Sequence, residues 1–222
     1  MKKIVFLMMS VLALTSCKFN GWDNDLIEAS DNVVTKEYKL KPFEEVHMRC
    51  VGAVELIQDE KKSGTVELTA PDNYIELYKF ENNGNELEID FAKQHINIHT
   101  KNVIIKVYTN DLLSLKNSGA SSIRMDSLDT DKIEITNSGV GSITIGGVAD
   151  EVTLTNSGVG SINAENLKAL NVKANVSGVG SITCYASEKI EGGVSGVGSL
   201  KYAGNPKQKD TKRTGVGGIS EM

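Results

Sequence analysis

From Val33 onwards, apolar and polar residues alternate in short runs separated by turn-forming residues. Runs such as residues 65–68 (TVEL) and 103–107 (VIIKV) are rich in β-branched side chains. Such alternation is typical of strands that bury one face. No window after residue 33 gives a persuasive amphipathic helix, although residues 72–80 could form a short one. The pattern therefore predicts a nearly all-β domain.

In residues 33–110 the alternation is irregular. It predicts strands at residues 44–48, 52–57, 65–68, 87–90 and 103–107. Turn-rich breaks at residues 59–64 and 81–85 predict hairpin-type connections between these strands.

Residues 111–222 contain a repeated Ser-Gly-Val-Gly-Ser-Ile unit. Its copies begin at Ser118, Ser138, Ser157, Ser177, Ser195 and Thr214, in steps of 20, 19, 20, 18 and 19 residues. Such a period is too short for a propeller blade and suits one coil of a β-helix. The sequence therefore predicts a β-helix, or β-solenoid, with coils of 18–20 residues.

Stacked coils place equivalent residues above one another, about 4.8 Å apart. Besides the ladder that begins each unit, two more are expected. One comprises Ala120, Val140, Val159, Val179, Val197 and Val216, and the other comprises Ile123, Ile143, Ile162, Ile182, Leu200 and Ile219. Because a solenoid needs its ends covered, residues 33–110 are expected to form the first coils and their cap. Residues 33–222 are then a single domain.

The paired glycines of each unit admit two structural explanations. They could provide positive φ at a corner, or allow close approach between coils. The functional alternative is a glycine-floored groove that is open to a ligand. The units lack the Lys-Ser/Thr of a phosphate loop and the Asp of the calcium-binding β-roll repeat.

The N-terminus has the pattern of an export signal. Two lysines precede an apolar stretch of eleven residues, which is too short to span a bilayer. Residues 14–17 (LTSC) resemble the bacterial lipobox, which implies cleavage of residues 1–16 and lipidation of Cys17. Residues 17–32 are then expected to be a lipidated tether. Their acidic character resembles a surface-export signal, so both periplasmic and cell-surface orientations remain open.

Charge argues against a nucleic-acid partner. The chain has 24 basic and 29 acidic residues, and removal of residues 1–16 leaves a net charge of −7. Phosphate backbones require clustered basic residues, and the one such cluster, residues 207–213, suits a solvated loop. Cys50 and Cys184 lie in alternating apolar patterns, so a disulfide between them is not predicted.

Several motifs together resemble the autotransporter adhesin head GIN domain family of exported Bacteroidetes proteins. They are Phe43-x-x-Val46, the strand at residues 52–56, residues 112–119 (LLSLKNSG) and the repeat units. The resemblance covers about residues 38–220. It implies a right-handed β-helix-like fold outside the inner membrane and an adhesin role by analogy, with no catalytic motif to transfer.

The side chains give little support for catalysis or metal binding. His95 and His99 would share one face of a strand, but metal sites need three or four ligands. The carboxylates of the repeats form no recurring pair, and the serine ladders have no base within their repeats. Tyr185 and Tyr202 are the best exposed candidates for ligand contact, although they could equally cap the coil edge.

We therefore expect a non-enzymatic outer-membrane lipoprotein without cofactor or metal. Its expected role is adhesion, scaffolding, or binding of a glycan or an envelope protein. The alternative is a polysaccharide lyase or glycoside hydrolase built on a β-helix.

Overall fold

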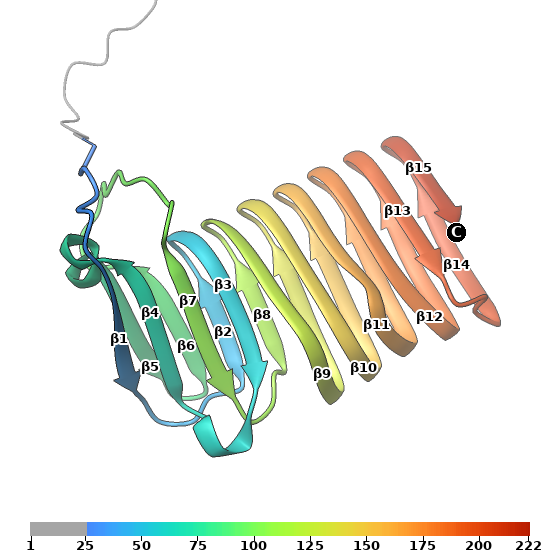
Figure 1. The fold of residues 1–222 in the computed structure, drawn as a ribbon. Helices are drawn as coiled ribbons and strands as arrows, with labels where there is room; N and C mark the ends of the chain where they lie inside the picture. The colour runs from blue at the N-terminus through green and yellow to red at the C-terminus, as the bar shows by residue number, and fades with distance from the viewer. Residues whose placement is uncertain (1–25) are drawn as a thin grey trace, which may run out of the picture.

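The structure is a computed structural model that describes residues 26–222, and its strands join in one 15-stranded sheet (Figure 1). The strands are β1 (Val33–Lys39), β2 (Glu45–Met48), β3 (Val51–Gln58), β4 (Thr65–Pro71), β5 (Tyr78–Asn83), β6 (Glu86–Phe91), β7 (Ile104–Thr109), β8 (Ser114–Asn117), β9 (Ala120–Asn137), β10 (Val140–Asn156), β11 (Val159–Val176), β12 (Val179–Val194), β13 (Val197–Ala203), β14 (Gln208–Arg213) and β15 (Val216–Glu221). Two 3-10 helices, η1 (Glu60–Lys62) and η2 (Asp72–Leu77), complete the fold.

The repeats form the predicted β-solenoid. Strands β9 to β12 are 16 to 18 residues long, and each bends around the coil and pairs in parallel with the next. The isoleucine ladder is confirmed by register, from Ile123 through Ile143 and Ile162 to Leu200 and Ile219. All its members before Ile219 are buried, so this ladder forms the spine of the apolar core.

A second internal row is polar over three successive coils. Asn117, Asn137 and Asn156 are fully buried and stacked in register. Nδ2 of Asn117 donates to Oδ1 of Asn137 at 2.8 Å, and Nδ2 of Asn137 donates to Oδ1 of Asn156 at 3.1 Å. Val176 and Val194 continue the same row. The amides thus satisfy one another along the stack, as buried polar groups require.

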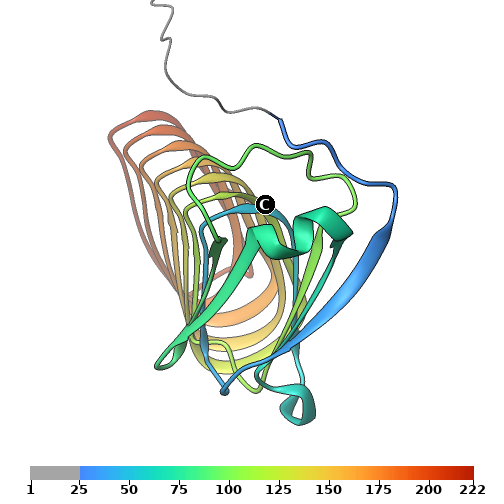
Figure 2. The same ribbon diagram turned by 90° about the vertical axis from the view of Figure 1, so that its left-hand side faces the viewer.

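The N-terminal strands form the first coils and a cap, as predicted (Figure 2). All five predicted strands are present as β2, β3, β4, β6 and β7. Strands β2, β3 and β7 pair in parallel with neighbouring coils, whereas β1 and β4 are antiparallel and close one face. The hairpin at residues 81–85 is confirmed by the antiparallel pair β5 and β6.

Two local predictions in this part need correction. The break at residues 59–64 is not a hairpin, because β7 pairs between β3 and β4. The helix considered at residues 72–80 is a 3-10 helix that ends at Leu77, where β5 begins. Its Tyr74 is fully buried, so η2 is held by packing over the open end of the solenoid.

The predicted signal peptide and Cys17 lie outside the described residues. Part of the predicted tether is described, and from Ile27 it lies against the cap. The main-chain N–H of Ile27 donates to the carbonyl of Asn97 at 2.9 Å, and Tyr74 donates its hydroxyl to the carbonyl of Ile27 at 2.5 Å. Asp72 accepts hydrogen bonds from Ser30 and Asn32. The ordered domain therefore begins before residue 33.

Among residues 26–222, no helix has the length and apolar character needed to cross a membrane.

The last coil carries charge at positions that earlier coils fill with apolar side chains. Lys209 stacks on buried Ile190, and Glu221 stacks on buried Tyr202. The Lys209 Nζ and the Glu221 Oε2 are 2.7 Å apart. An ion pair at inward positions is one way to prevent a sheet edge from pairing with another chain.

Candidate binding surface

The glycines of the repeat unit are explained by the stacking of the coils. A Cβ on Gly139 would lie 2.1 Å from the carbonyl oxygen of Gly119. Gly160 has φ +138°, and a Cβ there would lie 1.8 Å from the carbonyl oxygen of Gly141. Both structural explanations are therefore correct: close approach between coils applies to both glycines, and positive φ applies to Gly160. No ligand groove is needed to explain them.

The Ser-Gly-Val-Gly-Ser segments form one narrow edge of the solenoid, which we call the repeat edge. It is the corner at which β10, β11, β12, β13 and β15 begin, seen at the top of Figure 1. Its valines are in register from coil to coil, as predicted. Their exposed fractions are Val140 54%, Val159 51%, Val179 54%, Val197 54% and Val216 74%. The edge thus presents a continuous apolar row to solvent.

The segments of the repeat edge contain no charged side chain, and the nearest charge recorded on it is the Arg213 guanidinium, which donates to the carbonyl of Gly217 at 2.7 Å in the last coil. Residues 138–149, 157–164, 177–187, 195–200 and 214–220 contain no Asp, Glu, Lys or Arg. On either side of the valine row lie glycines without side chains and then serines, which are mostly exposed or half-buried. The hydroxyl of Ser138 donates to the carbonyl of Asn117 in the preceding coil at 3.3 Å. The surface is therefore apolar along its middle and hydroxylated along its borders.

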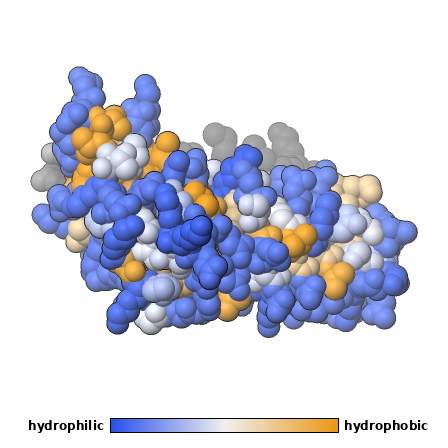
Figure 3. All heavy atoms as spheres, turned by 60° about the horizontal axis from the view of Figure 1, so that its bottom comes forward, coloured by the Kyte–Doolittle hydropathy of each residue, from blue (hydrophilic) through white to orange (hydrophobic). Residues whose placement is uncertain are grey.

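The other exposed apolar residues of the described part of the chain do not form such a row. Val148 is half exposed, but it stacks on Asp129 and Lys168. Figure 3 brings the opposite corners forward and shows apolar residues in small patches among hydrophilic ones. The continuous exposed valine row is therefore the candidate interaction site among the described residues.

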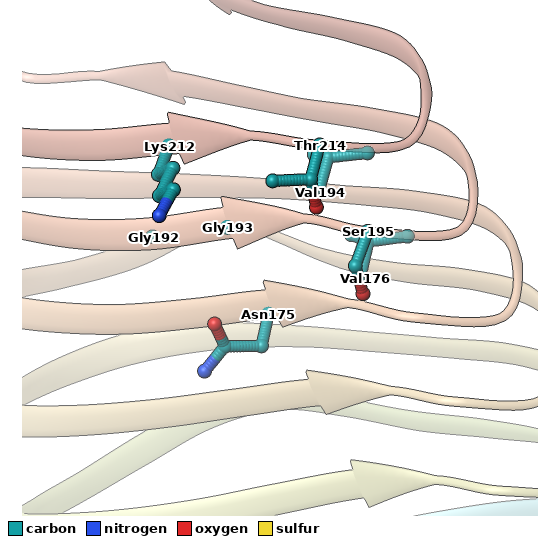
Figure 4. A pocket seen from close by; sticks show the side chains of 8 residues that line it. All are labelled: Asn175, Val176, Gly192, Gly193, Val194, Ser195, Lys212 and Thr214. Atoms are coloured by element: carbon teal, nitrogen blue, oxygen red, sulfur yellow. The ribbon is translucent and has the colours of Figure 1, made fainter.

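A hollow of about 390 Å³ borders the repeat edge at its C-terminal end (Figure 4). One outward row of stacked residues has no side chain at Gly193. This row comprises Thr136, Thr155, Asn175, Gly193 and Lys212. Asn175, Ser195, Lys212 and Thr214 surround this gap. The hollow is not predicted by any pattern considered above, although a Gly-Gly pair outside the repeat unit stands at residues 192–193.

The structure brings together a serine and a histidine that the sequence analysis did not connect. His47 Nε2 lies 2.9 Å from the Ser118 Oγ, and His47 Nδ1 lies 3.9 Å from the Glu86 Oε1. Burial lowers the pKa of His47 below its usual value, against the opposing effect of Glu86. The base comes from β2, outside the repeats, which is why a search within the repeats missed it.

The main-chain N–H groups next to this serine are already engaged. The main-chain N–H groups of Ser118 and Gly119 both donate to the carbonyl of Met48. They therefore cannot form an oxyanion hole beside the serine.

The other candidate residues do not converge on a site. His95 and His99 lie in an irregular segment, not on the expected strand, and His95 has φ +62°. Within the described residues, no three His, Cys, Asp or Glu side chains are grouped to hold a metal ion. Tyr202 is 7% exposed and packs in the core, so its prediction as an exposed contact is wrong. Tyr185 is half-buried, and the Lys168 ammonium lies 4.0 Å from its ring centroid.

The cysteines and several carboxylates also have structural roles. Cys50 and Cys184 are free and buried, and burial raises the pKa of each thiol to about 12. Three acidic residues of the repeats are paired with cations. These ion pairs are Arg124 with Asp126, Lys189 with Glu191 and Lys207 with Glu188.

The fold and its surface define a repeat protein of the β-solenoid class, capped at one end and built from rows of like residues. The family described as "putative auto-transporter adhesin, head GIN domain" matches residues 42–206. The chain belongs to this family, as the sequence resemblance predicted. The family indicates an envelope- or surface-associated protein with a binding or adhesion role.

Solved structures agree with this assignment. A "putative adhesin" from Bacteroides fragilis is 29% identical, with a TM-score of 0.75, over 88% of this chain and 100% of that chain. A "putative lipid binding protein" from Parabacteroides distasonis shares the fold at 20% identity and a TM-score of 0.56, over 89% and 99% of the two chains. A "putative adhesin" from Parabacteroides merdae does so at 16% identity and a TM-score of 0.55, over 89% and 99%. None of the curated proteins matches the chain.

Proposed function

We propose that this protein is a lipid-anchored, non-enzymatic adhesion head of the bacterial outer membrane, and that the repeat edge is its contact surface. The observation that carries the proposal is the row of half-exposed valines, which no other element of the described residues covers. Exposure of such a row to water is unfavourable, by about 25 cal/mol per Å² of apolar surface. Binding of a partner removes this cost.

The arrangement of the chain supports an anchored role. Ile27 and Ser30 contact the cap, so the chain enters the domain at its capped end. The repeats extend from there to β15 at the opposite end (Figure 1). A lipid on Cys17 would thus hold the cap towards the membrane and leave the repeat edge free along the solenoid.

The lipid anchor gives a direct prediction. Cys17→Ala should leave the protein unlipidated and out of the membrane fraction, because acyl chains on Cys17 are the proposed attachment. Metabolic labelling with a tagged fatty acid, followed by fractionation, measures both effects. Ser16→Ala is the matched control and should be labelled normally, since a small residue is kept before the cysteine. Label retained by the Cys17→Ala protein would contradict the proposed anchor.

The adhesive role is tested on the purified chain carrying Cys17→Ser, with glycan and protein arrays and with a panel of soluble polysaccharides. We expect array binding that falls at least tenfold in the double variant Val159→Asp, Val179→Asp, because charge is placed in the uncharged row. Thr153→Asp, on an outward position of another face, should bind normally. Cleavage of a polysaccharide would instead establish the lyase or hydrolase alternative.

A further inference from the structure

We propose that the repeat edge binds the repeat edge of a second copy of this chain, with the two solenoid axes antiparallel. The inference rests on the proposed function, because it names the partner of the same surface. The other side-chain groupings are less informative, since the N–H groups of Ser118 and Gly119 are engaged by Met48 and the hollow at Gly193 has Lys212 as its only charged lining residue.

Charge favours a second copy at this edge. The chain has a net charge of −5, so two copies repel each other on average. The repeat edge is a surface where they can meet without placing like charges together, because its segments contain no Asp, Glu, Lys, Arg or His side chain. Like charges placed together across an interface are unfavourable by several kcal/mol, so a surface without charged side chains avoids this cost.

The spacing of the edge also fits a second copy. The valines of the row are spaced at the strand separation of about 4.8 Å. The row of a second copy has the same spacing because its sequence is identical. The valine row is flanked by glycine rows without side chains, such as Gly139 and Gly141 beside Val140. The valines of one copy can therefore lie over a glycine row of the other. An interface that uses the same patch on both subunits is the isologous type found in two-fold dimers.

The size of the edge predicts a weak contact. Five valine-bearing coils span about 19 Å along the axis, and the five-residue edge is about 13 Å wide. This footprint is well below the roughly 800 Å² per partner of a standard stable interface. We expect a dissociation constant in the high micromolar to millimolar range for isolated copies. Arrays of anchored copies would bind far more strongly through multivalency.

The orientation follows from the cap. Two-fold pairing through one face allows the axes to be parallel or antiparallel. The segment between β6 and β7 lies on the side of the repeat edge, at the capped end, in both ribbon views (Figures 1 and 2). If the axes were parallel, the β6–β7 segments of the two copies would lie against each other. If the axes are antiparallel, the β6–β7 segment of one copy lies past the last coil of the other copy, and the two segments do not meet. The two capped ends then point in opposite directions, which suits contact between two facing membranes.

Engineered cysteines test the pairing in the chain carrying Cys17→Ser, whose Cys50 and Cys184 are buried. Under mild oxidation at millimolar protein, Val179→Cys at the centre of the row should give disulfide dimers. Thr153→Cys, on an outward position elsewhere, should not. A mixture of Val140→Cys and Val216→Cys proteins should give mainly the mixed disulfide, because antiparallel axes place these ends together. Predominant Val140–Val140 pairing, or equal yields from Val179→Cys and Thr153→Cys, would overturn the proposal.

Sedimentation equilibrium provides an independent measurement. We expect reversible dimers that strengthen with added salt, since salt screens the net repulsion and the contact contains no ion pair. Val159→Asp with Val179→Asp should abolish them, with an unchanged circular dichroism spectrum as the folding control. A chain that stays monomeric at 1 mM refutes self-association. If the wild-type chain is monomeric but Val159→Asp with Val179→Asp still reduces its binding to the arrays, the repeat edge is an adhesive surface for a partner other than a second copy.

Discussion

Gly160→Ala should lower the free energy of unfolding by about 4 kcal/mol and the melting temperature by about 10 °C. The added Cβ would lie 1.8 Å from the carbonyl oxygen of Gly141, and Gly160 holds φ +138°. The positive φ alone costs about 1–2 kcal/mol for a residue with a side chain. The rest arises because two stacked coils must separate to remove the overlap, which weakens their main-chain hydrogen bonds.

Gly218→Ala is the matched control, because Gly218 takes the position of the last serine in the final repeat unit. A Cβ there meets no atom within 4 Å, so the change should stay within about 0.5 kcal/mol. Urea unfolding followed by far-ultraviolet circular dichroism measures both variants. Equal stabilities for Gly160→Ala and Gly218→Ala would mean that the close approach of coils does not require glycine.

Much of the solenoid could be predicted because each coil has the same length and the same pattern of buried and exposed positions. A period of 18–20 residues and a β-branched alternation predict stacked strands, and the stack then determines which side chains share a row. The rows led by Ala120 and Ile123 were correct in every coil. Periodicity does not reveal how exposed each row is. The valines were predicted as a row, but their position on the outer corner became evident only from the coil geometry.

Features that depend on contacts between distant segments could not be predicted. The insertion of β7 between β3 and β4 depends on pairing across about 40 residues, and no local pattern encodes it. The approach of His47 to Ser118 joins residues 71 positions apart. Tyr202 was misjudged because its place after the repeat unit says nothing about which face of the strand is buried. The asparagine row was visible as Asn-Ser-Gly in three units, but its burial was not.

Asn137→Val should lower the free energy of unfolding by about 3 kcal/mol, even though valine occupies the same row two coils later. The substitution leaves Nδ2 of Asn117 without its 2.8 Å acceptor and Oδ1 of Asn156 without its donor. Both groups are buried, and each unsatisfied group costs about 1–3 kcal/mol. The apolar surface gained by valine offsets only part of this cost.

The triple variant Asn117→Val, Asn137→Val, Asn156→Val separates loss of hydrogen bonds from loss of packing. It removes the amides together, so it should be more stable than Asn137→Val alone and should lie within about 2 kcal/mol of the wild type. Full recovery is not expected, because Ser121 donates its hydroxyl to Asn117, and Asn156 donates to the carbonyl of Gly160. Chemical unfolding of the four proteins gives the coupling energy. A triple variant less stable than Asn137→Val would mean that the row stabilises the coils through the shape of asparagine and not through mutual satisfaction of its amides.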